Sequence, residues 1–282
     1  MKPAPDILCI GAAHWDIIGQ SPNSIGRGAD VPGTIRRAPG GVALNIAVGL
    51  AAEGLHAALI AAIGTDASGN ALCSFLKVSG VETTYLIRSA QTDCYLAIES
   101  PDGLIAAIAA ADALEGISPD AFETLKMDPE VTVLIDSGLA PPTLDWLARA
   151  IQVNDLRLAA ASAAKAKRLS PFLGTDACFY LNRMEAEALC DTGFADSTSA
   201  ALGLRSKGAT RAIITDGPSP ICDASPEGLL HTCPPNIRPS SITGAGDRFA
   251  AAHIAAEKNG LGRSAALAFA RDAAARHISD QP

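Results

Sequence analysis

The sequence predicts an α/β protein with a doubly wound, mostly parallel central sheet that is flanked by helices. Short apolar runs that end near glycine or aspartate recur along the chain, and alanine-rich stretches with helical spacing stand between them. This alternation is typical of parallel sheets with helices on both faces. Hydrophobic residues make up 48% of the 282 residues and charged residues 18%, which allows one large core. We therefore expect a single domain that spans residues 1–282.

The predicted strands are short and mostly apolar, because strands of a parallel sheet are buried on both faces. They are Ile7–Ile10, Ala57–Ile63, Val131–Ile135, Leu156–Ala160, Cys178–Leu181 and Ala212–Thr215. The predicted helices are Val42–Glu53, Ser68–Ser79, Pro142–Gln152, Arg183–Cys190, Ser197–Lys207, Asp247–Asn259 and Arg263–His277.

Two segments, approximately residues 14–37 and 81–110, break this alternation. The second contains two alternating runs, Thr92–Glu99 and Leu104–Ala109, on either side of a turn at Pro101–Gly103. We expect these segments to form a small antiparallel β lid. Ligands of open α/β sheets bind beyond the carboxyl ends of the strands, so a lid inserted there covers the ligand.

Charge and cysteine content restrict the partners and the compartment. The net charge of −8, with basic residues scattered along the chain, gives no reason to expect nucleic acid or an anionic membrane as a partner. No apolar run reaches the roughly 20 residues of a membrane helix. The seven cysteines include no Cys-x-x-Cys pair and indicate reduced thiols. We expect a cytoplasmic protein.

The most informative segment is Thr243-Gly244-Ala245-Gly246-Asp247, directly before an alanine-rich helix. Glycines allow a tight turn, and the backbone N–H groups at a helix N-terminus stabilise an anion. An aspartate there can take a proton from an alcohol that attacks a phosphoryl group held by the same amides. The alternative is an ordinary aspartate at a helix start after a glycine turn.

This segment resembles the C-terminal signature of the ribokinase-like (PfkB) carbohydrate kinase family. The resemblance implies an ATP- and Mg²⁺-dependent kinase in which Asp247 is the catalytic base. It also implies that the Gly244, Ala245 and Gly246 amides form an anion hole and that Thr243 helps to bind the nucleotide. Arg248 departs from the small residue usual in the family, and it either contacts phosphate or faces solvent. A monovalent-cation requirement stays open.

The N-terminal half carries two further matches to the family. Gly40-Gly41-Val42-Ala43-Leu44-Asn45 resembles the motif in which a diglycine lets the backbone approach the sugar and the asparagine binds a hydroxyl. Asp16 matches the aspartate that binds vicinal hydroxyls. Without the resemblance, these residues would be a turn before a helix and a surface aspartate at a strand end.

Residues at the ends of two predicted strands indicate where the nucleotide binds. Asn182 and Glu185 match an Asn-x-x-Glu motif that is tied in the family to magnesium and phosphate through water, although the same spacing is that of a helix capping box. Thr215 and Gly217 resemble the turn that presents amides to ATP phosphates. Asp216 between them is unusual there.

Three features resemble pseudouridine kinases within the family: Pro32-Gly33-Thr34-Ile35, Thr92-Asp93-Cys94-Tyr95-Leu96-Ala97-Ile98 and Asp112. The substrate of these kinases offers a 5′ hydroxyl. Asp93 and Tyr95 are candidate contacts to a base edge, or else ordinary lid residues. Ala159-Ala160 stands where an Asp-Pro pair is expected, which weakens the assignment. Ribose or another sugar or nucleoside remains an alternative acceptor, and a sensor that binds without transferring phosphate is the alternative of another class. The lid often pairs between subunits in this family, so a homodimer through the lid is one expected assembly.

Overall fold

The structure is a computed structural model that describes residues 4–123, 125, 128–237 and 243–279. Its main sheet has eight strands in the order β14-β13-β12-β11-β10-β9-β1-β4. The six strands from β12 to β4 are parallel, whereas β13 and β14 form an antiparallel hairpin at one edge. Their bounds are β1 Ile7–Ile10, β4 Ala57–Ile60, β9 Thr132–Asp136, β10 Leu156–Ala159, β11 Cys178–Asn182, β12 Arg211–Asp216, β13 Ser219–Ser225 and β14 Gly228–Thr232. The predicted doubly wound, mostly parallel sheet is confirmed.

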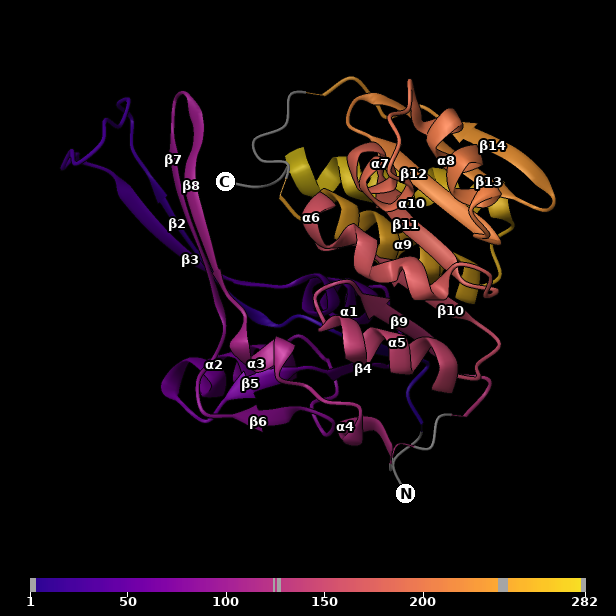
Figure 1. Cartoon of the computed structure of the whole chain (residues 1–282), viewed down its shortest axis with the longest axis horizontal. Coiled ribbons are helices and arrows are strands. Elements are labelled where there is room, and N and C mark those ends of the chain that lie inside the picture. The colour runs from indigo at the N-terminus through magenta and orange to yellow at the C-terminus, as the bar shows by residue number, and fades with distance from the viewer. Residues whose placement is uncertain (1–3, 124, 126–127, 238–242, 280–282) are drawn as a thin grey trace.

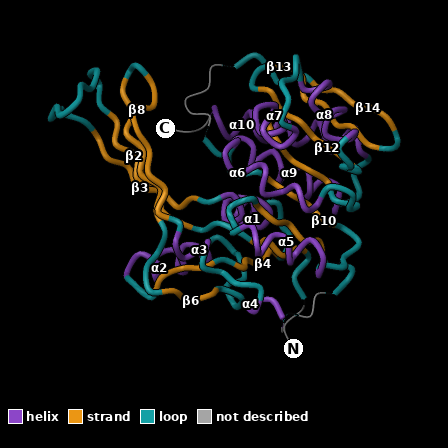
Figure 2. Tube along the Cα trace, viewed as in Figure 1, coloured by secondary structure: helices purple, strands orange, loops and turns teal. Residues whose placement is uncertain are grey.

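Helices cover both faces of this sheet (Figure 2). The residues of a strand alternate between the two buried clusters. In β1, Ile7 and Cys9 belong to one buried cluster while Leu8 and Ile10 belong to the other. One layer holds α1 Val42–Ala52, α2 Ala67–Val78, α9 Ala245–Lys258 and α10 Arg263–Ser279. The other holds α3 Asp112–Glu115, α4 Asp120–Glu123, α5 Pro141–Ala150, α6 Ala163–Ala166, a 3₁₀ turn at Lys167–Phe172, α7 Arg183–Cys190 and α8 Ser197–Ser206.

The lid is a separate four-stranded sheet that projects from the main body (Figure 1). It consists of β2 His14–Gln20, β3 Thr34–Gly40, β7 Cys94–Ser100 and β8 Gly103–Ala110 in the order β3-β2-β7-β8. The two outer pairs are antiparallel as expected, but β2 and β7 run parallel because both strands leave the main body in the same direction. Residues 81–93 do not join this sheet: β6 Ile87–Ser89 pairs with β5 Ala62–Gly64 instead.

Helix α9, which begins after the glycine turn at Gly244, is fixed in place at two points along its length. A Cβ on Gly49 of α1 would lie 2.6 Å from the Cβ of Ala251, so only glycine permits this approach of α1 to α9. At the other end of α9, Glu257 accepts hydrogen bonds from Arg157 and Arg211, both at 2.7 Å. The two contacts together hold α9 against α1 and the sheet.

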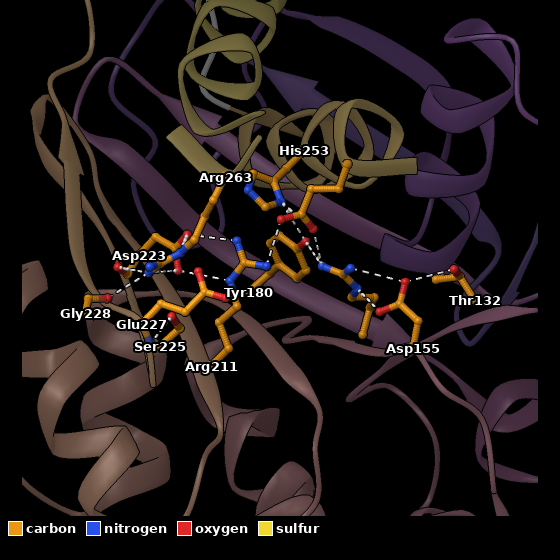
Figure 3. A network of polar contacts seen from close by, with 12 residues as sticks. Thr132, Asp155, Tyr180, Arg211, Asp223, Ser225, Glu227, Gly228, His253 and Arg263 are labelled. Atoms are coloured by element: carbon orange, nitrogen blue, oxygen red, sulfur yellow. Dashed lines mark hydrogen bonds and ion pairs between the residues drawn. The ribbon is translucent and has the colours of Figure 1, made fainter. Parts of the chain in front are cut away.

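Arg211 belongs to a network of polar contacts that joins the sheet to both C-terminal helices (Figure 3). Arg157 joins the network through Tyr180 and Glu257. Asp223 of β13 binds Arg211 and Arg263, and Arg157 donates to the Tyr180 hydroxyl at 3.0 Å. Burial lowers the pKa of His253, whose Nδ1 lies 2.9 Å from the same hydroxyl, to about 4. His253 is therefore neutral near pH 7 and adds no charge to the network.

Candidate active site

Asp247 lies in the first turn of α9, at the wall of two cavities. The helix starts after Gly244, whose positive φ of 75° is a backbone conformation that favours glycine. The Asp247 carboxylate accepts a hydrogen bond from the Asn45 side chain at 2.8 Å. Asn45 belongs to α1, so the close packing of α1 on α9 places the two predicted site residues together.

The Asp247 carboxyl has a pKa raised to about 7. Removal from bulk water is the main cause, and the nearby negative charges of Asp136 and Asp16 add to it, while the hydrogen bond from Asn45 acts in the opposite direction. A carboxyl with a pKa near 7 can accept a proton at neutral pH more readily than an ordinary aspartate.

The diglycine has a steric role that the structure makes explicit. Gly41 has a φ of 104°, and a Cβ there would lie 2.3 Å from the carbonyl oxygen of Ala12. A Cβ on Gly40 would lie 2.4 Å from the Asp16 carboxylate. The two glycines thus bring the chain before α1 against the end of β1 and against Asp16.

Asp136 organises the same region and was missed by the sequence analysis. Its fully buried carboxylate accepts hydrogen bonds from the backbone N–H groups of Ala12 at 2.7 Å, Gly138 at 2.7 Å and Ala43 at 3.0 Å. Burial raises the pKa of this carboxyl. The available signal was its position directly after a predicted strand, at the edge of the sheet where ligands bind.

The first cavity, of about 490 Å³, opens between the lid and the helices α1 and α9. Such a volume is within the range of roughly 300–1,000 Å³ that is usual for small-molecule sites. Its lining combines lid, α1 and α9 side chains with one each from α2 and α10: Asp16, Ile18, Arg36, Ala38, Pro39, Leu44, Asn45, Val48, Gly49, Ala52, Phe75, Thr243, Gly244, Asp247, Arg248 and His277. Hereafter it is called the lid cavity.

The second cavity, of about 330 Å³, lies over the carboxyl ends of β10, β11 and β12. Its lining is Val42, Asn45, Ile46, Ala159, Ala160, Ala161, Tyr180, Leu181, Asn182, Glu185, Ile213, Thr215, Thr243, Gly244, Gly246, Asp247, Phe249 and Ala250. Hereafter it is called the strand-end cavity. Asn45, Thr243, Gly244 and Asp247 line both cavities, so Asp247 stands where they meet.

Asn182 and Glu185 line the strand-end cavity and also form the capping box that their spacing allowed. Glu185 N–H donates to the Asn182 side chain at 2.9 Å, and Asn182 N–H donates to Glu185 Oε2 at 2.8 Å. Burial and the negative charge of Asp247 raise the pKa of Glu185 to about 7. Two carboxyls with raised pKa values beside one cavity are an arrangement that a divalent cation would stabilise.

In the turn after β12, one residue lines the strand-end cavity and another forms an ion pair. Thr215 lines the strand-end cavity, whereas Gly217, with a φ of 56°, is outside its lining. Asp216 between them accepts a hydrogen bond from Arg183 at 3.1 Å. The unusual aspartate therefore has a partner on α7.

The two lid candidates are placed differently. Asp93 is buried, and its two oxygens accept the Ala113 and Leu114 N–H groups at 2.9 Å, which caps the short helix α3. Neither residue is in the lining of the lid cavity, but Tyr95 pairs in register with Asp16 and shares its face of the lid. The geometry favours Tyr95 over Asp93 as a ligand contact.

Three residues of the lid cavity with charged or aromatic side chains, Arg36, Phe75 and His277, had no role predicted from the sequence. Arg248 binds Glu53 and the Gly49 carbonyl on α1, so it braces α9 against α1 rather than facing solvent. The pattern of the sequence does not show which lid residues turn inward, because that depends on the strand register.

The described residues include neither a membrane-spanning helix nor a cluster of metal-ligating side chains. No helix there is long and apolar enough to cross a membrane. Likewise, within residues 4–123, 125, 128–237 and 243–279, no three His, Cys, Asp or Glu side chains gather as a metal-binding cluster.

The chain is similar to known kinases in sequence and in fold. A family model described as pfkB family carbohydrate kinase matches residues 4–281. Pseudouridine kinase from Escherichia coli (strain K12) is 25% identical over 288 aligned positions, covering 99% of this chain and 92% of that enzyme. Ribokinase from Bacillus subtilis (strain 168) is 29% identical over 282 positions, covering 97% and 92%. The solved structure of Arabidopsis thaliana ribokinase complexed with ribose and ATP superposes with a TM-score of 0.85 at 19% identity, covering 99% and 94%.

Proposed function

Because the chain belongs to the pfkB family of carbohydrate kinases, we propose that it transfers the terminal phosphate of ATP to the 5′ hydroxyl of pseudouridine. Activity as a sugar or nucleoside kinase follows from the family, and the acceptor is the proposal. The observation that supports phosphoryl transfer at this site is the position of Asp247 in the wall shared by the lid cavity and the strand-end cavity. The acceptor is proposed from the similarity to a pseudouridine kinase. An acceptor in the first and a nucleotide in the second would meet at this carboxylate.

The proposed reaction is an in-line phosphoryl transfer. Asp247 takes the proton of the acceptor hydroxyl, whose oxygen then bonds to the terminal phosphorus of ATP. The bond from that phosphorus to the bridging oxygen breaks, and ADP leaves with the electron pair. The N–H groups at the start of α9, from Gly244 to Gly246, have no intrahelical partner and are available to the charged phosphoryl oxygens.

Acceptor binding is assigned to the lid cavity. Asp16 and Asn45 offer a carboxylate and an amide to sugar hydroxyls, and the chain at Gly40 and Gly41 leaves them room. Tyr95 lies on the same face of the lid as Asp16 and is the proposed contact to the base.

ATP is assigned to the strand-end cavity, where Asn182, Thr215 and Thr243 supply polar groups among mostly apolar neighbours. Gly217 belongs to the adjoining turn and is proposed to offer its backbone to the phosphates. Glu185 is proposed to bind Mg²⁺, because this ion prefers carboxylate oxygens as ligands, and a water molecule can bridge the ion and the carboxylate. When bound, the ion would neutralise charge on the phosphates. Whether the activity requires K⁺ is tested by measuring ADP release with and without this ion.

The pH dependence should report the Asp247 carboxyl. Asp247 must be ionised to accept a proton, so kcat/KM is expected to rise about tenfold per pH unit below about pH 7 and level off above it. Asn45→Leu removes a hydrogen bond that lowers this pKa and should move the inflection to higher pH. The measurement is a pH–rate profile. Since the pKa of Glu185 is also about 7, Glu185→Gln is the control, and loss of the inflection in that variant would contradict the assignment.

The magnesium proposal predicts a separate effect of Glu185→Gln. A glutamine oxygen can still accept the Asn182 N–H, so the capping box and the melting temperature should be retained. The Mg²⁺ concentration for half-maximal rate is expected to rise about 10-fold or more, as for other water-bridged metal partners. Glu187→Gln, on the same helix but bound to Arg183 and outside the cavity lining, is the matched control. An unchanged Mg²⁺ requirement in Glu185→Gln would remove this residue from the metal site.

The lid also supports a proposed homodimer. Ile35, Ile98 and Ile108 are 79%, 38% and 65% exposed, and the register puts them on the face opposite Asp16. Strand β8 is exposed along its whole length at the sheet edge, which favours pairing with another chain. Ile108→Lys should therefore shift the mass measured by light scattering from dimer to monomer. Leu202→Lys, at an exposed leucine on α8 outside the lid, should leave this mass unchanged. A wild-type protein that is monomeric at micromolar concentration would refute the proposal.

The function is tested by ADP release with pseudouridine, uridine, adenosine, ribose and fructose as acceptors. Pseudouridine is expected to give the highest kcat/KM. Ribose is the second candidate, because the similarity to ribokinase covers nearly the whole chain. Tight binding of an acceptor without ADP release in any of these assays would instead indicate a sensor.

The seven cysteines are all unpaired thiols, which is the basis for proposing a cytoplasmic location.

A further inference from the structure

Two adjacent arginines of the lid, Arg36 and Arg37, face opposite sides of strand β3. Arg36 pairs in register with Ile18, and both line the lid cavity. Arg37 pairs with Ile17 on the other face, where its guanidinium lies 4.0 Å from the centre of the Trp15 ring and donates to Ser68 at 2.7 Å. These contacts with Trp15 and Ser68 give Arg37 a structural role.

Arg36 differs from Arg37 in having no such environment. Among the residues that the structure describes, none forms a hydrogen bond or ion pair with the Arg36 guanidinium, and its side chain is exposed at the cavity. Arg248, the other arginine in this lining, is already bound to Glu53. Arg36 is therefore an arginine of the lid cavity whose N–H donors are available to a ligand.

The register also fixes where those donors lie relative to the reacting end of the cavity. Asp16 pairs with Ala38, and Arg36 stands two residues further along the lid, a step of about 7 Å away from Asp16. Asp16 and Asp247 offer carboxylates to hydroxyls at the inner end of the cavity. A guanidinium at the outer end offers a planar fork of N–H donors, which suits paired or planar oxygen acceptors rather than hydroxyls alone.

We propose that Arg36 is a specificity-determining residue that binds acceptor oxygens on the part of the substrate beyond the sugar ring. The chemistry is that of a carbonyl edge of a nucleobase or of a carboxylate. This inference rests on the proposed function, since it assigns the sugar to the inner end of the lid cavity. Plain ribose has no such group and cannot use Arg36.

The experiment compares Arg36→Gln with Arg37→Gln, neighbours on one strand that face opposite sides. For each variant and the wild type, kcat/KM and the calorimetric Kd are measured with pseudouridine, uridine, ribose and gluconate. In Arg36→Gln the preference for the oxygen-bearing acceptors over ribose should fall about 10- to 100-fold, mostly through KM, the effect expected for one charge-assisted hydrogen-bonding group. Arg36→Lys should recover binding of gluconate better than that of pseudouridine, because lysine keeps the charge but not the fork.

An equal loss for ribose and pseudouridine, or the same loss in Arg37→Gln, would overturn the inference. If the wild type binds these acceptors but transfers no phosphate, the proposed function fails while the Kd ratios still decide on Arg36. Binding of none of the four acceptors overturns both.

Discussion

Replacing Asp247 by Asn is expected to lower kcat by about 10²- to 10⁴-fold, the usual contribution of a general base. Asparagine has nearly the same shape and can still accept the hydrogen bond from Asn45, so α9 and both cavities should be retained. What it loses is the basicity that the buried position gives to this carboxyl, whose pKa is raised to about 7. The measurement is ADP release in single and multiple turnovers, with the Kd of ATP and the melting temperature measured beside it.

The control for this experiment is Asp30→Asn, an exposed aspartate in the loop between β2 and β3. It removes the same charge from the protein without touching either cavity, so its turnover should equal that of the wild type. Near wild-type turnover in Asp247→Asn would show that another group accepts the proton. Loss of ATP binding in that variant would show instead that Asp247 acts on the nucleotide.

Replacing Asp136 by Ala is expected to have the largest effect on stability. It leaves the N–H groups of Ala12, Ala43 and Gly138 without their acceptor, and each buried unsatisfied N–H costs about 1–3 kcal/mol. Relief of a buried carboxylate offsets part of this cost. A net loss of about 3 kcal/mol would lower the melting temperature of a chain of this size by roughly 6–12 °C.

The same variant should also weaken acceptor binding, because Asp136 holds the end of β1 and the start of α1 against each other. Gly41 and Asn45 depend on that junction for their positions. Asp136→Asn keeps one acceptor oxygen and should lie between the wild type and Asp136→Ala in both melting temperature and acceptor KM. A fully active, equally stable Asp136→Ala protein would contradict this account.

Asp93→Ala is the comparison that separates the two effects. Asp93 also accepts two backbone N–H groups, those of Ala113 and Leu114, but outside the lining of the lid cavity. It should lower stability with a much smaller change in acceptor KM. A large rise in KM would show that the candidate substrate contact predicted from the sequence is real.

The sequence was sufficient for elements whose local signal agrees with their buried position. The strand predicted at Ile7–Ile10 and the helix predicted at Arg183–Cys190 have the same bounds in the structure, because apolar runs and the Asn182 cap act locally. The hairpin β13–β14 was missed, since Ser219–Ser225 mixes polar and apolar residues and so carries a weaker pattern than an apolar run, although most of this strand is buried.

Motif residues were identified without the structure because glycine and aspartate are required by backbone geometry and charge at fixed places. Gly41 and Gly244 have positive φ angles that favour glycine, and Asp247 stands at a helix start where the motif puts it. The spacing of Asn182 and Glu185 predicted either a capping box or a nucleotide-site motif. The capping box is present, and both residues also line the strand-end cavity.

Only the tertiary structure decided which distant residues share a site. Asn45 and Asp247 are 202 positions apart and meet because α1 packs on α9 through Gly49. The burial of Asp136 and the inward face of Arg36 follow from strand pairing, which no local pattern specifies. The amino-acid order alone determined the kind of fold and the motif residues, whereas the raised pKa of Asp247 arises from burial and neighbouring charges that exist only once the chain has folded.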